Sequence, residues 1–114
     1  SVAGYRGLPA SAAYGATKAG LINMAESLKP ECDRLGIKLQ IVNPGFVRTP
    51  LTDKNPFPMP FLMEPEDAAA ALIRGLDGNG FEVSFPKRFT WMLKFLRCLP
   101  YALYFPMISR ATKQ

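Results

Sequence analysis

The stretch "SAAYGATKAG", residues 11–20, places a phenol at Tyr14 and an ammonium at Lys18 among small side chains. Residues 12–35 are rich in Ala, Leu, Met, Lys and Glu, which favour a helix, and Gly36 is suited to ending it. Side chains four residues apart are neighbours on a helix surface, and a cation near a phenol favours the ionised phenol. The pair is therefore a candidate acid–base device. The alternative is that the Tyr packs and the Lys is solvated.

The run that follows the helix, "IKLQIVNPG", residues 37–45, alternates apolar side chains and ends in Asn-Pro-Gly. This pattern predicts a strand over 37–42. A helix that leads directly into an apolar strand is typical of an α/β fold with a parallel sheet. Pro30 removes a backbone hydrogen bond, so we expect it to kink the helix near residues 25–26 or to end it early. One helix face is predicted to be apolar, through Leu21, Met24, Ala25 and Leu28.

After residue 45 we expect one long loop followed by several short helices and strands. Residues 46–63 hold four Pro and several large apolar side chains, which indicates a functional lid or a docking surface. A short helix is expected over 64–77 and a short strand over 81–86. Residues 87–114 are expected to form two helices that are split at Pro100.

Composition restricts the class of protein. The chain has 114 residues, the size of one small domain, and it begins without Met, as a piece of a longer sequence would. It contains no His, and Cys32 and Cys98 form no CxxC motif, so no metal site is expected. Two separate thiols suit a reducing compartment, and we expect a cytoplasmic location.

The net charge of +5 comes from the tail, since residues 87–114 carry six cations and no carboxylate. One helical face is expected to hold Phe89, Met92, Leu93 and Leu96, and the opposite face Thr90, Lys94 and Arg97. Basic, aromatic and amphipathic character together indicate a helix that lies on a membrane surface. An equal alternative is a tail that packs on its own domain or on a second subunit. Nucleic acid is not an expected partner, because no reading motif accompanies the cations.

Two motifs resemble those of the short-chain dehydrogenases/reductases. The first is "SVAGYRGLPASAAYGATKAG", residues 1–20, in which Ser, Tyr and Lys follow the pattern Ser-x12-Tyr-x3-Lys. The second is "IVNPGFVRTP", residues 41–50, with the pattern Pro-Gly-x-Val-x-Thr. The resemblance covers residues 1–86. It implies the C-terminal part of a Rossmann-type, doubly wound parallel sheet, to which residues 87–114 add a basic and aromatic helical tail.

The resemblance also implies an oxidoreductase that moves a hydride between NAD or NADP and a ketone or alcohol. Ser1 would hold the substrate oxygen, Tyr14 would be the general acid/base, and Lys18 would bind the nicotinamide ribose and make the phenol more acidic. The cofactor residues would then be Tyr14, Lys18, Pro44, Gly45, Val47 and Thr49. The apolar loop matches the family's substrate lid, and a hydrophobic substrate would meet Ser1, Phe46, Leu51 and Phe57.

Other parts of the family pattern are absent from these residues. The Gly-rich phosphate loop is missing, and "GLDGNG", residues 75–80, follows a helix and not a strand, so NAD and NADP both stay open. We expect the 114 residues alone to be inactive and marginally folded, and the complete form to be a homo-oligomer, by analogy with the family. The alternative is a truncated, non-catalytic fragment or membrane-surface module that retains the motif.

Overall fold

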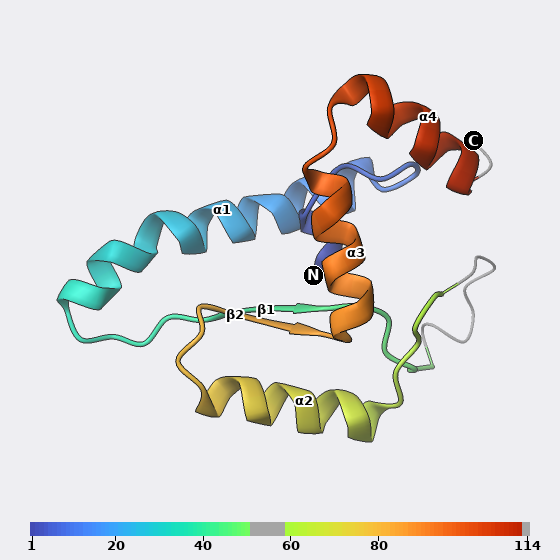
Figure 1. Ribbon diagram of the computed structural model, residues 1–114. Helices are drawn as coiled ribbons and strands as arrows, with labels where there is room; N and C mark the ends of the chain where they lie inside the picture. The colour runs from blue at the N-terminus through green and yellow to red at the C-terminus, as the bar shows by residue number, and fades with distance from the viewer. Residues whose placement is uncertain (51–58, 113–114) are drawn as a thin grey trace.

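The computed structural model describes residues 1–50 and 59–112 (Figure 1). Two short strands pair in parallel, with Ile41 opposite Glu82 and Pro44 opposite Phe85. A helix connects them, so the centre of the chain is a β–α–β unit, and the predicted α/β class is confirmed. The elements are the 3-10 turn η1 (Val2–Gly4), helix α1 (Ala12–Arg34), strand β1 (Ile41–Pro44), helix α2 (Pro65–Asp77), strand β2 (Glu82–Phe85), helix α3 (Lys87–Arg97) and helix α4 (Tyr101–Thr112).

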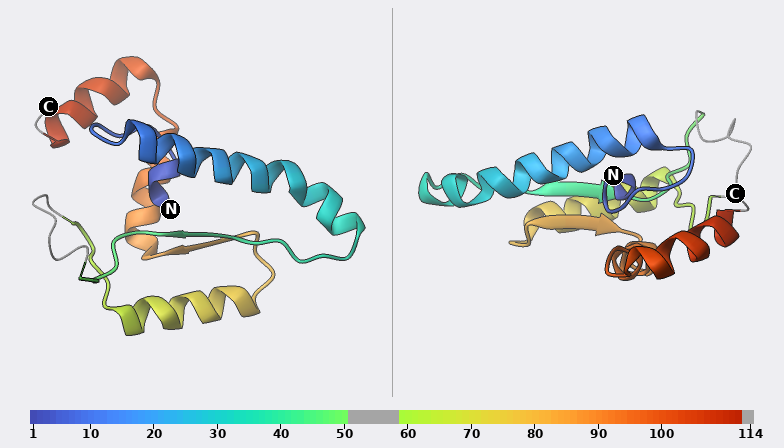
Figure 2. Two further views of the ribbon diagram at one scale, coloured as in Figure 1. Left: turned by 180° about the vertical axis from the view of Figure 1, so that it is seen from behind. Right: turned by 90° about the horizontal axis from the view of Figure 1, so that it is seen from above.

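Helices lie on both sides of the two-stranded sheet, with α1 on one side and α2 on the other (Figure 1 and Figure 2). Helix α2 approaches β2 closely because Gly75 has no side chain: a Cβ there would come within 2.3 Å of Val83 Cγ1. Ala68, Val83 and Phe85 form a buried cluster in this part of the chain. A second buried cluster joins the N-terminal residues to α3 and consists of Val2, Tyr5, Phe89 and Leu93.

Helix α1 forms as predicted and continues through Pro30, so an early end at this residue is a wrong expectation. One lost backbone bond is tolerated within a helix of 23 residues, and Figure 1 shows the last turns bending. The helix ends before Gly36, whose φ of +73° lies in the left-handed region that favours glycine. The amide of Ile37 donates to the carbonyl of Cys32, as in a Schellman motif, and the chain turns back toward the sheet.

Strand β1 begins later than the sequence pattern predicts. Residues 37–40 have no strand partner in the described part of the chain, and the ladder starts at Ile41 and continues to Pro44. The partner strand determines these bounds, because β2 has only four residues and its first residue, Glu82, pairs with Ile41. The Gln40 side chain instead donates hydrogen bonds to two backbone carbonyls around the end of α2. Apolar alternation alone therefore predicts a start of the strand that is four residues too early.

The tail forms two helices separated at Pro100, as predicted. The predicted faces of α3 are partly wrong. Thr90, expected on the polar face, is only 1% exposed, and Met92, expected on the apolar face, is 43% exposed. Phe89 and Leu93 pack against the N-terminal cluster and determine which side of α3 is buried. The separation of residues 1–86 and 87–114 into two domains stays a prediction.

Candidate functional site

Tyr14 and Lys18 lie on one face of the first turns of α1, as their spacing predicts. The Lys18 ammonium lies 5.3 Å from the centre of the Tyr14 ring, within range of a cation–π contact. Tyr14 is 55% exposed and Lys18 is half-buried. The phenol is thus accessible to a bound molecule, while the cation is held beside its ring.

The turn η1 lies against α1 at the level of Lys18. A Cβ on Gly4 would come within 2.8 Å of the Lys18 carbonyl carbon and oxygen, and one on Gly15 within 3.4 Å of the Ala3 carbonyl oxygen. Two glycines therefore let backbone approach backbone at this crossing. The crossing holds the turn that follows Ser1 against the backbone of Lys18.

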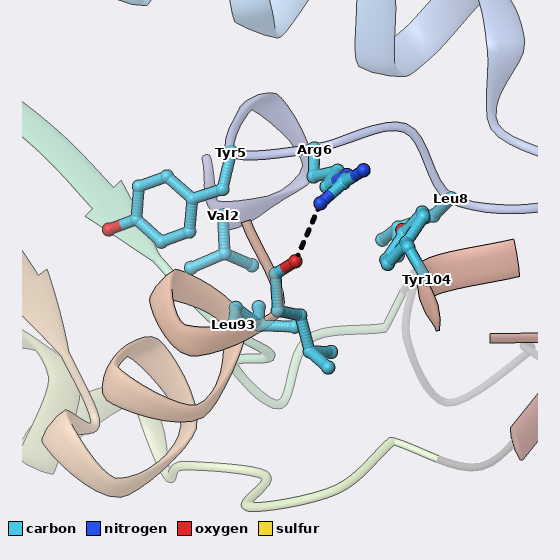
Figure 3. Close-up of a pocket in the computed structure, with 7 residues that line it drawn as sticks. Val2, Tyr5, Arg6, Leu8, Leu93 and Tyr104 are labelled. Atoms are coloured by element: carbon cyan, nitrogen blue, oxygen red, sulfur yellow. Dashed lines mark hydrogen bonds between the residues drawn. The ribbon is translucent and has the colours of Figure 1, made fainter. Parts of the chain in front are cut away.

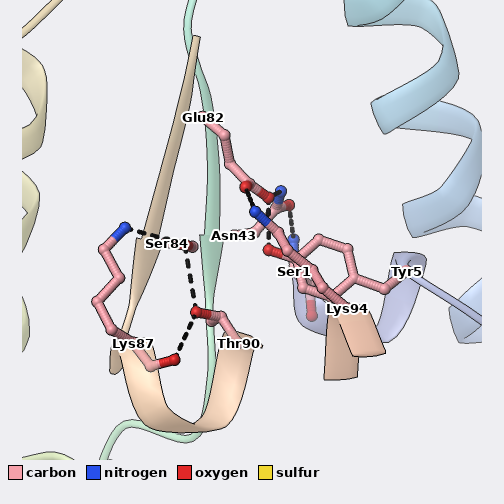
Figure 4. A network of polar contacts seen from close by, with 8 residues as sticks. All are labelled: Ser1, Tyr5, Asn43, Glu82, Ser84, Lys87, Thr90 and Lys94. Carbon is pink, nitrogen blue, oxygen red and sulfur yellow. Dashed lines mark hydrogen bonds and ion pairs between the residues drawn. The ribbon is translucent and has the colours of Figure 1, made fainter. Parts of the chain in front are cut away.

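Ser1 is held from its other side by Asn43, near the end of β1 (Figure 4). The Ser1 amine donates to Asn43 Oδ1 at 3.0 Å, and Asn43 Nδ2 donates to Glu82 Oε2 at 2.7 Å. Asn43 is only 1% exposed. The Tyr5 hydroxyl also donates to Glu82, and Lys94 forms an ion pair with it. One carboxylate therefore connects the N-terminal residues, both strands and α3 around Ser1.

The charge state of this network is well defined. Burial by itself raises the pKa of the Glu82 carboxyl, but hydrogen bonds from Lys94, Tyr5 and Asn43 outweigh it and leave this pKa below its usual value. Burial, and then the bond to Glu82, raise the pKa of the Tyr5 phenol. At neutral pH Glu82 is therefore the anion that accepts and Tyr5 the neutral group that donates, so the network around Ser1 stays intact.

The first residues of the predicted cofactor segment make packing contacts. Pro44 pairs with Phe85, and the Gly45 amide donates to the Phe85 carbonyl at 2.8 Å. A Cβ on Gly45 would come within 2.8 Å of the Phe89 ring, so the bare α-carbon makes room for α3. A cofactor contact of Pro44 or Gly45 stays a prediction.

Val47 takes part in an isolated parallel β-bridge that leaves its own amide and carbonyl outside the ladder. It lies opposite Met63, but the Phe46 carbonyl and the Arg48 amide make the two hydrogen bonds, at 2.9 and 2.8 Å. In a parallel bridge the groups of the intervening residue point the opposite way, so the amide and carbonyl of Val47 face away from Met63. An amide and a carbonyl that point outward in this way can exchange hydrogen bonds with an amide group of a ligand. The predicted contact of Thr49 stays a prediction.

The predicted substrate residue Phe46 takes part in an aromatic cluster. It is half-buried and stacks on Phe89 with ring centroids 5.8 Å apart, and Phe61 tilts against the same Phe89 ring at 5.9 Å. These three rings form an apolar wall beside the end of β1. Leu51 and Phe57, the other predicted apolar substrate residues, lie outside the described residues.

Arg6, in the loop that follows η1, closes the carbonyl end of α3 (Figure 3). Its Nη1 donates to the carbonyls of Leu96 at 2.8 Å and Arg97 at 3.1 Å, and also to that of Leu99. A cation suits the negative end of a helix. The guanidinium carbon also lies 3.9 Å from the centre of the Tyr104 ring. Arg6 therefore attaches the loop before α1 to both tail helices.

A small pocket of about 10 Å³ lies beside Arg6, between η1, α3 and α4. It has room for about one water molecule and is not lined by Tyr14 or Lys18. This pocket is therefore a packing gap and not the place where a substrate would meet the phenol.

Several residues that position the site, among them Asn43, Gly4 and Arg6, were not singled out from the sequence. Asn43 belongs to the quoted Asn-Pro-Gly motif, so a signal for it existed. Gly4 belongs to the Gly-containing stretch before Tyr14. No pattern indicates Arg6, because its partners on α3 are about 90 residues away in the chain.

Comparison with known proteins gives consistent matches. Residues 1–57 match the family model for short chain dehydrogenases. An uncharacterized oxidoreductase of Myxococcus xanthus is 41% identical over 104 residues, which cover 91% of this chain and 41% of that protein. An uncharacterized oxidoreductase of Mycobacterium tuberculosis is 38% identical over 100 residues, which cover 88% and 40%. A 3-oxoacyl-(acyl-carrier-protein) reductase of Rickettsia prowazekii is 46% identical over 54 residues, which cover 47% and 22%. The chain thus spans about two-fifths of the length of the first two relatives.

Proposed function

Because the chain belongs to the short-chain dehydrogenase family, we propose that it forms part of an NAD(P)-dependent oxidoreductase that interconverts a ketone and an alcohol. Relatives named as oxidoreductases support this activity. The observation that carries the proposal is that the Lys18 ammonium lies 5.3 Å from the centre of the Tyr14 ring, while the Lys18 backbone contacts the turn that follows Ser1. The activity belongs to a protein of the relatives' length, called here the full-length protein, and the 114 residues alone are inactive.

The proposed chemistry at the phenol is proton transfer. Tyr14 gives a proton to the carbonyl oxygen as the ketone becomes an alcohol, and takes it back in the reverse direction. The Lys18 ammonium beside the ring favours the phenolate that Tyr14 becomes when it gives up its proton. Ser1 Oγ accepts a bond from the Ala3 amide at 3.3 Å, and its own proton is available to bind and orient the substrate oxygen.

The described residues fit a nicotinamide nucleotide at this place. Lys18 provides donors for the ribose hydroxyls, and the outward amide and carbonyl of Val47 suit the carboxamide group. Thr49 is proposed to add a contact from the same segment, and Pro44 and Gly45 to hold the segment against β2. When bound, the nicotinamide supplies or accepts the hydride.

The proposed substrate is a small hydrophobic carbonyl compound or the corresponding alcohol. Phe46 and Phe61, which pack on the buried Phe89 ring beside the end of β1, would bury an apolar chain. Leu51 and Phe57 are proposed to add apolar contacts to the substrate. The name of the Rickettsia relative specifies a 3-oxoacyl group as its substrate, which supports a carbonyl on an aliphatic chain.

The proposed assembly is a cytoplasmic homo-oligomer. Leu21, Met24 and Leu28 on α1 are exposed in the chain. An apolar face of this kind needs cover, from a second subunit or from the rest of the full-length protein.

The test is Tyr14→Phe in the full-length protein, with carbonyl-dependent oxidation of NADPH and NADH as the assay. We expect turnover to fall by about 10²–10⁴-fold, the usual contribution of a general acid, with nucleotide affinity retained in a fluorescence titration. The matched control is Tyr101→Phe on α4, which is 71% exposed and leaves turnover unchanged. Wild-type turnover in Tyr14→Phe would contradict the proposal and favour a non-catalytic role for the segment.

A further inference from the structure

The outer face of α3 carries apolar side chains. Trp91 is 66% exposed, Phe95 64% and Met92 43%. Together with Arg88, which is also exposed, they occupy helix positions i, i+3, i+4 and i+7, which form one stripe along a helix. The stripe lies on the side of α3 away from buried Phe89.

Helix α4 repeats this arrangement. Four exposed residues have the same spacing and line a shallow groove of about 400 Å³, together with Ala111: Leu103, Pro106, Met107 and Arg110. The opposite side of the helix is buried through Tyr104 and Ile108. We call the two stripes together the tail surface, which consists of Arg88, Trp91, Met92 and Phe95 on α3 and Leu103, Pro106, Met107 and Arg110 on α4.

The two helices that carry the tail surface lie on the same side of the molecule. The right view of Figure 2 shows α3 and α4 together on the side away from α1. A large flat partner can therefore approach the tail without displacing the helix that carries Tyr14.

The charged residues of the tail itself are all positive. Every charged residue after Glu82 is a cation. Lys94 is already paired with Glu82, and the cations exposed on the two tail helices are Lys87, Arg88, Arg97 and Arg110. Because no carboxylate stands among these residues, the tail attracts anions.

We propose that the tail surface binds the face of an anionic lipid bilayer. Trp and Phe side chains enter the boundary between headgroups and acyl chains, while cations beside them meet the lipid phosphates. Helices of 11 and 12 residues suit a contact that lies in the plane of one leaflet. Within residues 1–50 and 59–112, none of the helices combines the length and the apolarity that crossing a bilayer requires.

Charge favours this partner over the other candidates. In a two-fold contact between two copies, each tail would face an identical set of cations, and like charges placed opposite one another are destabilising. Nucleic acid would use the cations but would leave both apolar stripes uncovered. An anionic bilayer satisfies the cations and the apolar side chains at the same time.

The experiment is co-sedimentation of the full-length protein with vesicles of phosphatidylcholine, with and without phosphatidylserine. We expect binding to the anionic vesicles, weak binding to the neutral ones, and release by salt but not by inorganic phosphate at equal ionic strength. Arg88→Gln with Arg110→Gln should weaken binding about tenfold or more, since each cation near an anionic surface contributes about fivefold. Trp91→Ser with Phe95→Ser should weaken it by at least about tenfold.

The matched control is Ile73→Ser on α2, where an apolar side chain is 60% exposed outside the tail surface, and it should bind as the wild type does. Circular dichroism checks that each variant is folded. Unchanged binding of the folded tail variants would overturn the proposal, as would failure of the wild type to bind anionic vesicles. A change from oligomer to monomer in Trp91→Ser with Phe95→Ser, without vesicle binding by the wild type, would identify a second copy as the true partner.

Discussion

Helix α1 has 23 residues and buries only Gly15, whereas α3 has 11 residues and buries three side chains. The longer helix carries the candidate catalytic pair, but its apolar residues Leu21 and Met24 are about half exposed, at 49% and 53%. Within the described residues, α3 is held by a side-chain cluster, and α1 is held mainly where η1 lies against its first turns. The candidate catalytic pair and the side chains that stabilise this part of the chain therefore lie on different helices.

The largest expected effect tests the side-chain cluster. Leu93→Ala removes a buried side chain that packs with Val2 and Tyr5, and should lower the free energy of unfolding by about 2–5 kcal/mol. Leu21→Ala on α1, at a half-exposed position, should cost less than about 1 kcal/mol. Urea unfolding of the full-length protein, followed by circular dichroism, measures both values. A Leu21 cost as large as the Leu93 cost would remove the contrast between the helices and would show that other residues of the full-length protein cover α1.

The next effect tests the backbone crossing of η1 and α1. Gly4→Ala places a Cβ within 2.8 Å of Lys18 backbone atoms, which cannot rotate away, and should cost about 1–3 kcal/mol. In the full-length protein we also expect lower turnover, because Ser1 moves relative to Lys18. The control is Gly20→Ala on α1, where a Cβ meets nothing within 4 Å, and it should raise the free energy of unfolding by up to about 1 kcal/mol. Unchanged stability and turnover in Gly4→Ala would contradict the close contact.

A third effect, of similar size, tests the carboxylate that connects the strands to α3. Glu82→Gln keeps the shape but removes the charge that Lys94 pairs with, and should cost about 1–3 kcal/mol at pH 7. The pKa of Glu82 is depressed by its partners, so its contribution is present above the unfolded pKa of about 4.5 and is lost as pH falls through the folded pKa. Urea unfolding between pH 7 and acid conditions should therefore show a steeper decline for the wild type than for Glu82→Gln. Parallel curves would mean that Glu82 is not ionised in the folded protein.

The smallest effect concerns an exposed ion pair on α1. Lys29 Nζ lies 2.6 Å from Asp33 Oδ1, with side chains 34% and 55% exposed. Asp33→Asn should change the free energy of unfolding by less than about 0.5 kcal/mol, because solvent screens such pairs. A loss above 1 kcal/mol in the same urea assay would mean that the end of α1 is held more tightly than its exposure indicates.

Local signals predicted most elements, because they need only a few neighbouring residues. Helix α1 was predicted from its composition and the stop at Gly36. Helix α2 was predicted from Pro65 at its first position, the acidic residues of its first turn and the stop at Gly78. The start of β1 was not predictable, because it depends on where Glu82 begins the partner strand. The buried face of α3 was also not predictable, because Phe89 and Leu93 are buried against Val2 and Tyr5, which lie far away in the sequence.

The same division applies to the candidate site. The pairing of Tyr14 with Lys18 follows from a spacing of four residues on a helix. The contact of Ser1 with Asn43 joins residues 42 positions apart, and nothing local to either one indicates it. Sequence patterns therefore predicted the candidate catalytic residues, while the residues that hold them in place became visible only in the structure.

Arg6 has a mechanical consequence. Its guanidinium binds three carbonyls at the end of α3 and lies against the Tyr104 ring of α4, while its backbone belongs to the segment that leads from Ser1 to Tyr14. Arg6 therefore adds to the other links between the tail and this segment, which are the buried cluster of Val2, Tyr5, Phe89 and Leu93 and the bond from the Tyr104 hydroxyl to the Gly7 carbonyl. A force that displaces the tail must either carry the N-terminal segment with it or break several charge-assisted bonds at once.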